Sequence, residues 1–261
     1  MDASLWVAKT GLDAQQKRMS VISNNLANVN TTGFKRDRAV FEDLLYQTMR
    51  QPGAQTGQDA LSPTGLVLGT GTRVGATEKN HAQGNMLQTD NALDIAIDGA
   101  GFFQILQGDG TIGYSRDGSF KLDNTGRLVN SSGRLLQPEI AIPANSRSIS
   151  IGKDGTVSVQ PFDQAASVVV GNIQTANFIN PAGLQPVGGN LYTETAASGA
   201  PQIQAPNADG SGALVQGALE ASNVNVVEAM VNMIETQRAY EVNSKAISAA
   251  DGMLRFINNN L

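Results

Sequence analysis

Few residues in this chain are of types that could carry out chemistry. The single histidine, His81, has no serine and aspartate at the spacing of a Ser-His-Asp triad. A pair of carboxylates could serve a hydrolase, and Asp94 and Asp98 share one face of an expected strand. Asp117 and Asp123 lie in turn-like segments, where aspartate is common. The pattern favours a surface histidine and turn aspartates, and we expect no enzyme.

The composition excludes further kinds of site. The 261 residues include no cysteine, which removes disulfides, thiol catalysis and cysteine-ligated metal centres. One histidine and a formal net charge of −5 make a zinc site and nucleic-acid binding unexpected. The glycine pairs at 69–71 and 99–101 lack the third glycine and the strand–helix context of a nucleotide-binding loop. We therefore expect no cofactor, no metal, no nucleic acid and no small-molecule substrate.

The charge distribution suits a chain that packs against copies of itself. Charged residues make up only 16% of the chain, and no lysine or arginine occurs between Lys153 and Arg238. A neutral, loop-rich surface would look the same. The acidic N-terminus has no apolar core of a Sec signal, and no apolar run is long enough to span a membrane. We expect neither a cleaved signal peptide nor a transmembrane helix.

Apolar residues repeat every seven positions at both ends of the chain. The N-terminal series is Leu5, Leu12, Met19 and Leu26, with Ile22 three residues after Met19. The C-terminal series is Val226, Met233, Tyr240, Ile247, Leu254 and Leu261. Narrow stripes of this period are typical of coiled coils. We predict one helix over about residues 4–29 and a second of about 35 residues, capped by Ser222, Asn223 or Asn225. Neither helix can bury its stripe alone, so they pair with each other or with neighbouring subunits.

The middle of the chain has the pattern of β structure. Strand-like runs alternate with turns over residues 94–159, at Asp109-Gly110, Asp117-Gly118, Gly126, Gly133 and Asp154-Gly155. Residues 165–220 continue with shorter runs, and 35–75 contains a helical patch over Phe41–Met49 before a Gly/Pro-rich extended stretch.

These elements predict an α+β fold with a discontinuous helical domain. The long N- and C-terminal helices form a coiled-coil assembly domain from 1–35 plus 222–261. An extended connector spans 36–75, and a central β-rich domain of short antiparallel strands spans 76–221.

Several stretches resemble one known family, the axial proteins of the bacterial flagellar rod and hook. SNNLANVNTTGFKR (23–36) is similar to the N-terminal signature, and ASNVNVVEAMVNMIETQRAYEVNSKAI (221–247) to the C-terminal signature. DGAGFFQI and YSRDGSF resemble the shared central domain. AVFEDLLYQTMRQPGAQT (39–56) is most similar to members of the distal rod. The motif residues are Asn24, Asn25, Asn28, Gly33, Phe34, Asn223, Asn225, Arg238 and Tyr240.

The resemblance implies a structural subunit of the flagellar basal body that spans the periplasm. It implies a helical homopolymer acting as a rigid hollow drive shaft, which transmits torque to the hook and encloses the export channel. The implied partners are copies of itself, proximal rod subunits, hook protein, and the ring bushing proteins of the peptidoglycan and outer membrane. Export through the flagellar type III apparatus is implied as well.

The resemblance also assigns roles to residues. Except for Leu261, the heptad residues named above, with Ile22, are expected at the coiled-coil subunit interface. Asn24, Asn25 and Asn28 are expected to form buried hydrogen bonds between subunits; the alternative is plain capping of the first helix, with Gly33 as its left-handed terminator. Asn223 and Asn225 are expected to cap the second helix or to lie at a subunit contact. Gln237, Ser244, Asp251 and Asn258 fix helix register or lie on a solvated flank. The rod-type connector residues expected to stiffen the polymer are Phe41, Leu44, Leu45, Tyr46, Gln51, Pro52 and Gly53; a linker without fixed structure is the alternative.

Two other functions stay open at this point. One is a proximal rod or hook subunit of the same family. The other, from a different class, is a β-rich surface adhesin or glycan-binding module. Exposed aromatic residues would favour the glycan-binding module, and Phe178 and Tyr192 are the only aromatics between residues 163 and 225.

Overall fold

The computed structural model describes residues 3–53, 63–162, 166–208 and 210–259. Their contacts form two compact units. Unit 1 comprises Met1–Ala27, Asp37–Glu78 and Asn225–Leu261, and unit 2 comprises Asn28–Arg36 and Lys79–Val224. Part of the expected connector, 54–62, and the heptad position Leu261 lie outside the described residues. Among the described helices, none has the length and hydropathy needed to cross a bilayer.

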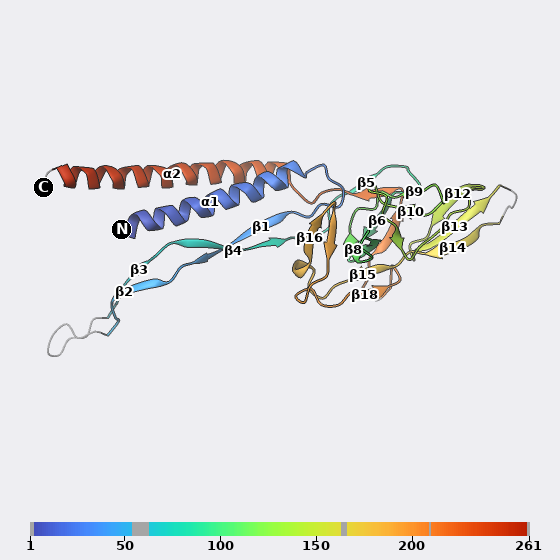
Figure 1. The fold of residues 1–261 in the computed structure, drawn as a ribbon, viewed down its shortest axis with the longest axis horizontal. Coiled ribbons are helices and arrows are strands. Elements are labelled where there is room, and N and C mark those ends of the chain that lie inside the picture. The colour runs from blue at the N-terminus through green and yellow to red at the C-terminus, as the bar shows by residue number, and fades with distance from the viewer. Residues whose placement is uncertain (1–2, 54–62, 163–165, 209, 260–261) are drawn as a thin grey trace. The chain divides into compact units, whose positions relative to one another are not determined.

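Two long helices form one layer of unit 1 (Figure 1). The first, α1, runs over Ala3–Ala27, and the second, α2, over Val226–Asn259. They pack antiparallel: Arg18, late in α1, donates to Oδ1 of Asn232, early in α2, at 3.3 Å. The helices predicted from the heptad repeats are confirmed in place and length.

The two helices meet through small side chains. The buried residues between them are Ala14, Ile22, Ala229, Thr236 and Ala250. At Gly11 the approach is close, because an added Cβ would lie 3.2 Å from the amide nitrogen of Asn243. Small residues at a contact let helix backbones come near each other.

The rest of unit 1 is a strand ribbon. Strand β1 (Asp37–Asp43) pairs with β4 (Thr72–Lys79), and β2 (Tyr46–Arg50) pairs antiparallel with β3 (Leu66–Gly69). The helical patch expected over Phe41–Met49 is therefore wrong. Its residues satisfy their backbone hydrogen bonds across the ribbon, with Tyr46 opposite Gly69 and Thr48 opposite Val67. A partner strand whose paired residues lie 16 to 23 positions away overrode the local helix propensity.

The described residues of unit 2 form sixteen strands and one short 3-10 helix. They are β5 (Met86–Gln88), β6 (Ile95–Asp98), β7 (Phe102–Leu106), β8 (Ile112–Ser115), β9 (Lys121–Leu122), β10 (Leu128–Val129), β11 (Leu136–Gln137), β12 (Ser146–Ile151), β13 (Thr156–Pro161), β14 (Val168–Asn172), β15 (Thr175–Asn177), η1 (Pro181–Gly183), β16 (Gln185–Gly188), β17 (Leu191–Thr193), β18 (Gln202–Gln204), β19 (Ala213–Gln216) and β20 (Ala218–Glu220).

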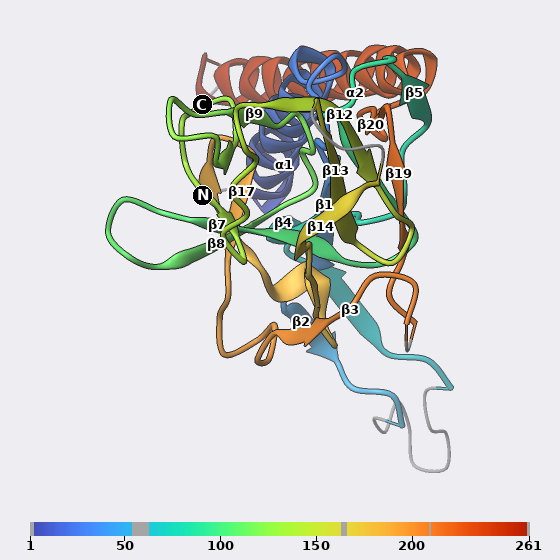
Figure 2. The ribbon, with the colours of Figure 1, turned by 90° about the vertical axis from the view of Figure 1, so that its right-hand side faces the viewer.

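These strands form several small sheets around one core. The largest has seven strands in the order β16-β17-β8-β7-β15-β18, with β11 also paired to β7. Strands β12, β13 and β14 form a three-stranded sheet (Figure 2), and β19–β6, β20–β5 and β10–β9 form pairs. The main buried cluster is Ile95, Ile97, Phe103, Ile105, Phe120, Leu128, Leu136, Ile140, Ile142, Ile151, Val157, Val159, Ile173, Leu191 and Leu214. The α+β class with short antiparallel strands is confirmed.

Most of the predicted hairpin turns are present. Gly110, Gly126, Gly133 and Gly155 all have positive φ, which glycine adopts without steric cost, and each follows or precedes a paired strand segment. Asp117-Gly118 is the exception, because β8 pairs with β7 and β17, whereas β9 pairs with β10. Gly118 instead allows a close approach, since an added Cβ would lie on the carbonyl oxygen of Ile95.

Candidate functional site

The family motif after α1 continues as a tight segment of unit 2. Gly33 has φ +67, and its N–H donates to the carbonyl oxygen of Glu220 at 2.8 Å. An added Cβ there would lie 2.7 Å from backbone atoms of Arg116 and Asp117. The expected left-handed glycine is confirmed. It does not terminate the helix, however, because α1 ends at Ala27 and Gly33 bonds to β20 instead.

Next to Gly33, three charged side chains are buried together. Lys35 and Glu220 have side chains that are 0% exposed, and Arg116 is 4% exposed. Lys35 Nζ lies 2.5 Å from Glu220 Oε1, and Arg116 Nη1 lies 3.4 Å from Glu220 Oε2. Burial lowers the pKa of both Lys35 and Arg116, and the carboxylate of Glu220 opposes both shifts. One carboxylate thus holds two buried cations.

Backbone groups complete the cluster. Lys35 Nζ donates to the carbonyl oxygen of Ala82 at 2.8 Å, and the N–H of Gly84 donates to Glu220 Oε1 at 2.8 Å. Arg116 Nη2 donates to the carbonyl oxygen of Gly99 at 2.7 Å. Removing one member of such a cluster leaves a buried charge unpaired, which is strongly destabilising.

Asn223, expected as a helix cap or a subunit contact, instead joins three segments of unit 2. Its Oδ1 accepts the N–H of Arg36 at 2.8 Å, and its Nδ2 donates to the carbonyls of Asn80 and Ala82 at 2.8 and 2.9 Å. Capping falls to Asn225, whose Oδ1 accepts the N–H groups of Val227 and Glu228 at 3.0 and 3.3 Å. Of the two asparagines, only the second is a cap.

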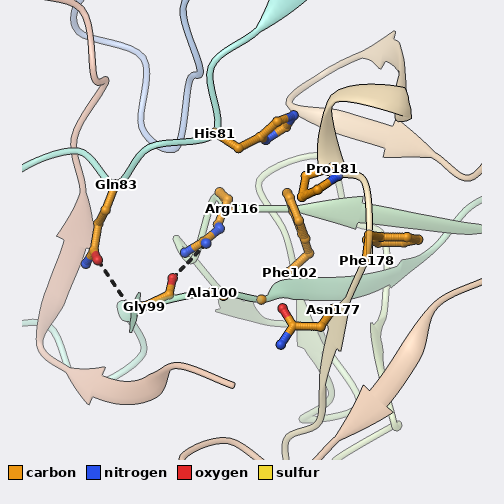
Figure 3. Close-up of a pocket in the computed structure, with 10 residues that line it drawn as sticks. His81, Gln83, Gly99, Ala100, Phe102, Arg116, Asn177, Phe178 and Pro181 are labelled. Atoms are coloured by element: carbon orange, nitrogen blue, oxygen red, sulfur yellow. Dashed lines mark hydrogen bonds between the residues drawn. The ribbon is translucent and has the colours of Figure 1, made fainter. Parts of the chain in front are cut away.

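A pocket of about 230 Å³ adjoins the buried charges (Figure 3). Its wall includes His81, Phe102, Arg116, Asn177 and Phe178. The ring of His81 meets those of Phe102 and Tyr192 edge-on, each at 5.5 Å between centroids. The expectation of a surface histidine is therefore wrong, since aromatic rings cover it.

The environment keeps His81 neutral. Burial, followed by the positive charges of Lys35, Arg116 and Lys79, lowers its pKa from 6.5 to about 4. The Pro181 backbone opposes the shift, although among the described residues neither ring nitrogen has a partner at full hydrogen-bond distance and angle. Among those residues no group of three or more His, Asp or Glu is placed to hold a metal ion.

The two predicted heptad stripes differ in how far the described residues bury them. On α1, Ile22 is buried and Leu5, Leu12, Met19 and Leu26 are half-buried. On α2, Met233 and Ile247 are half-buried, whereas Val226, Tyr240 and Leu254 are exposed. The contact with α1 within the chain thus uses only part of the α2 stripe.

The remaining motif residues have separate surroundings. Asn25 is buried and exchanges two hydrogen bonds of 2.8 Å with the backbone of Asp37 in unit 1. Asn28 Oδ1 accepts the Thr31 hydroxyl at 3.1 Å in the turn after α1. Phe34 is half-buried beneath Lys79 Nζ, 5.3 Å from its ring centroid. Asn24 and Arg238 are exposed.

The connector residues are largely open to solvent. Leu45 is 89% and Tyr46 59% exposed, and Phe41, Gln51, Pro52 and Gly53 are exposed as well. Leu44 is half-buried, and its N–H donates to the carbonyl of Gly71 at 2.9 Å. Ordinary soluble surfaces do not gather large apolar residues in this way.

Sequence reasoning missed the buried charge cluster. Lys35 lies directly after the motif glycine and Phe34, and Arg116 lies within YSRDGSF, so both were within stretches already marked as family signatures. The signal that was available was a lysine and an arginine inside motifs whose other residues, apart from Arg36 and Asp117, are uncharged. Nothing in the local sequence pairs them with Glu220, which is 185 residues from Lys35.

Family models match three parts of the chain. Residues 5–35 match "Flagella basal body rod protein", residues 96–159 match "Flagellar hook protein FlgE/F/G D1 domain", and residues 215–260 match "Flagellar basal body rod FlgEFG protein C-terminal". The first and third models include Lys35 and Glu220, and the second includes Arg116. Each member of the buried cluster therefore lies in a different family segment.

Several full-length relatives carry the same name. The flagellar basal-body rod protein FlgG of Buchnera aphidicola subsp. Schizaphis graminum is 56% identical over 98% of both chains. FlgG of Borreliella burgdorferi is 47% identical, covering 99% of this chain and 98% of the relative, and FlgG of Bacillus subtilis is 38% identical, covering 97% and 96%. Such proteins are structural, not enzymatic, and are part of the flagellar basal body. This chain therefore belongs to the FlgG family of flagellar basal-body rod proteins, the structural subunits of the distal rod.

Proposed function

We propose that this subunit polymerises helically with copies of itself into a rigid hollow drive shaft. The shaft transmits torque to the hook and encloses an export channel. The observation that supports this most directly is a row of apolar side chains on α2 that the described residues leave exposed. Apolar rows of this kind mark sites of protein association.

That row lies on the side of α2 turned away from α1. Val227, Val231 and Ile234 are spaced by four and three residues, and Val242 and Met253 continue on the same face. Their exposed fractions run from 49% at Ile234 to 71% at Val227. The residues buried against α1, Ala229, Thr236 and Ala250, lie about half a turn away. One face of α2 is therefore used within the chain, and the other is available to a neighbour.

The terminal helices are proposed to form the coiled-coil layer of the shaft. In it, the heptad residues of both helices, together with Ile22, would lie at the contacts between subunits. They are Leu5, Leu12, Met19, Ile22, Leu26, Val226, Met233, Tyr240, Ile247 and Leu254. Large apolar residues left 39 to 44% exposed at Val226, Tyr240 and Leu254 support this assignment, because burial against a neighbour would remove them from water.

The strand ribbon is proposed to stiffen the shaft as the rod-type connector. In β2 and β3 every residue is exposed, so the pair has no core of its own. An isolated two-stranded ribbon is marginal in water. Covering Leu45, Tyr46 and Val67 on neighbouring subunits would both stabilise the ribbon and link subunits along the axis.

The domain organisation we propose follows from these roles. In the polymer, residues 1–35 with 222–261 would act as the assembly domain, 36–75 as the connector and 76–221 as the β-rich body, although residues 28–36 and 222–224 pack within unit 2 of the single chain. The partners we propose, besides copies of the chain, are proximal rod subunits, hook protein, the ring bushing proteins and the type III export apparatus, with the shaft spanning the periplasm. The family membership supports these partners.

A charge introduced on the face of α2 turned away from α1 tests whether that face forms contacts between subunits. In Val242→Glu the monomer should keep its fold, because the valine is 65% exposed. Polymer formation, measured by sedimentation and electron microscopy, should fall at least about ten-fold, since each buried carboxylate costs several kcal/mol.

The matched control is Val169→Glu on β14, which places the same charge at a valine 60% exposed in unit 2. This variant should form straight polymers in normal yield. Normal polymers from Val242→Glu would contradict the assignment of α2 to the subunit interface.

A further inference from the structure

The two heptad stripes of unit 1 lie on one side of the helix pair. On each helix, the residue three positions after a stripe residue is buried against the other helix: Ile22 follows Met19 on α1, and Thr236 follows Met233 on α2. Because the helices are antiparallel, positions turned by the same angle from the contact fall on the same side of the pair. The stripes therefore converge there, which agrees with the partial exposure of their residues.

The strand ribbon covers a different side of α1. An added Cβ at Gly71, between β3 and β4, would lie 3.2 Å from Thr10 Cβ and 3.5 Å from Val7 Cα. Leu5 lies two residues before Val7, Leu12 lies two residues after Thr10, and two residues turn a helix by about 200°. The stripe of α1 therefore points away from the ribbon.

The two stripes are also in register. Two contacts fix it: Arg18 donates to Asn232 at 3.3 Å, and an added Cβ at Gly11 would lie 3.2 Å from the amide nitrogen of Asn243. Between and beyond these contacts, the stripe residues fall in matching levels that repeat every seven positions on both helices. The levels are Leu5 with Ile247, Leu12 with Tyr240, Met19 with Met233, and Leu26 with Val226. We call these residues the shared stripe.

The middle two levels of the shared stripe have uncharged borders. The bordering positions, four residues after each stripe residue, are all exposed there and are Gln16, Ser23, Gln237 and Ser244. At the level of Leu5 and Ile247, the same positions hold the charged residues Lys9 and Asp251. Covering the middle levels would therefore take no bordering charge out of water, which avoids a large desolvation cost.

Helix α2 continues past the start of α1 (Figure 1). In this register Ala3, the first residue of α1, lies level with residue 249, so residues 251–259 extend beyond it. On this segment, which we call the overhang, Met253 is 63% and Leu254 40% exposed. The overhang is about 13 Å long, and two neighbouring levels of the shared stripe lie about 10 Å apart. It is therefore long enough to cover the middle two levels.

We propose that the overhang of one copy lies along the middle two levels of the shared stripe of a neighbouring copy. The contact rests on the polymer proposed above and specifies how its helices meet, with two helices from one subunit and one from the next. It would remove Met253 and Leu254 from water together with the stripe that they cover. Because the overhang and the stripe are different parts of the chain, the contact is head-to-tail and can repeat without closing.

The absence of cysteine makes cross-linking a direct test. Two variants of the full-length chain are mixed at a concentration that favours assembly, one with Gln16→Cys beside the shared stripe and one, carrying an affinity tag, with Asp251→Cys on the overhang. A short bis-maleimide should then join tagged to untagged chains.

The control mixture replaces Gln16→Cys by Lys245→Cys, on the face of α2 turned away from α1. It should give at least about ten-fold less of the mixed product, because only cysteines held side by side have a high effective concentration. Equal yields from the two mixtures would overturn the proposal.

A pair of matched glutamates tests the apolar part of the contact. Leu254→Glu on the overhang should lower the yield of mixed product at least about ten-fold, since the contact would have to bury a carboxylate. Leu122→Glu makes the same change on β9 of unit 2, at a leucine that is also 40% exposed, and should leave the yield unchanged. The same yield from both variants would contradict the proposed contact.

Sedimentation of the same mixtures separates this contact from the polymer itself. Long polymers without the mixed product would overturn the contact and leave the shaft standing. Mixed product in small oligomers that never grow would support the contact and contradict the shaft. If neither polymer nor mixed product forms, both proposals fail.

Discussion

The two units of this subunit treat their apolar residues in opposite ways. Unit 2 buries a core of large apolar residues, in which Phe103, Ile105 and Leu136 are each 0% exposed, although others such as Ile179 lie on its surface. Unit 1 buries mainly alanine and threonine between its helices and leaves Val227, Val242 and Leu45 largely exposed. Unit 2 therefore has the core of an independently stable fold, whereas unit 1 has apolar surface left for burial.

The ion pairs of the two units also differ in burial. The ion pairs of unit 1, such as Lys17–Asp13 and Arg255–Asp251, are exposed and contribute little to stability. Unit 2 holds Glu220 against two cations with all three side chains buried. Breaking an ion pair should therefore lower the free energy of unfolding much more in unit 2 than in unit 1. The chain carries one spectroscopic probe for each unit, because its only tryptophan, Trp6, lies in unit 1 and its only histidine, His81, lies in unit 2.

The largest effect should follow Glu220→Gln. The change leaves Lys35 and Arg116 buried without a counter-charge, which we expect to lower the free energy of unfolding of unit 2 by about 3–5 kcal/mol. Urea unfolding followed by the His81 NMR signal measures it. In the control, Glu78→Gln, an exposed partner of Arg38 is lost, and the cost should stay below about 1 kcal/mol. If the two substitutions cost the same, the contrast between buried and exposed charges is wrong.

The next largest loss of stability should come from substituting one of two glycines, which serve as each other's comparison. Gly33→Ala should destabilise unit 2 by about 3 kcal/mol, because it combines an unfavourable positive φ with a backbone contact at 2.7 Å. Gly133→Ala has a similar φ, +76, with nothing within 4 Å of the added Cβ, and should cost only about 1 kcal/mol. Thermal unfolding of both variants measures the difference. Equal losses would mean that the approach of Arg116 to Gly33 contributes nothing.

Acid should weaken unit 2 before unit 1. The pKa of His81 is about 4 in the fold against 6.5 ordinarily, so between these values the unfolded chain binds a proton that the folded chain does not. Stability should fall as pH drops from about 6.5 to 4, by about 2–3 kcal/mol. Urea unfolding at pH 7 and pH 4.5 measures the slope, and His81→Gln should remove most of it. A slope that persists in His81→Gln would assign the acid sensitivity to other groups.

The smallest effect should come from the cap of α2. Asn225→Ala removes the side-chain acceptor for Val227 and Glu228 and should cost about 1 kcal/mol. Hydrogen exchange at the first turn of α2 should speed up while the His81 signal is unchanged. Gln237→Ala, at an exposed site in the same helix, serves as the control. If the His81 signal moved instead, the first turn of α2 would be coupled to the core of unit 2.

Regular periodicity made the helices and most hairpins predictable. The seven-residue repeat identified α1 and α2, and Asp-Gly turns identified the hairpins at Gly110 and Gly155. The face of α2 that meets α1 was not predictable, because Ala229, Thr236 and Ala250 carry no hydrophobic signal. A stripe of large residues indicates what is apolar, but not which partner covers it.

The rest depended on contacts distant in sequence. Residues 41–49 were predicted to be helical because their ribbon partners lie beyond residue 65 in the sequence. His81 read as a surface residue because the rings that cover it, Phe102 and Tyr192, come from separate strands. Asn223 read as a cap because its true partners lie at Arg36, Asn80 and Ala82.

The position of Asn223 has a consequence for the timing of folding. Its amide bonds to Arg36 across 187 residues and to Asn80 across 143, and Lys35 meets Glu220 across 185. Because ribosomes make the N-terminus first, the signature motif waits for nearly the whole chain before it can close. Closing such long loops is slow compared with forming hairpins. The hairpins of the β body can therefore form early, whereas within unit 2 the joint between residues 33–36 and 220–223 must wait until nearly all of that unit has been made.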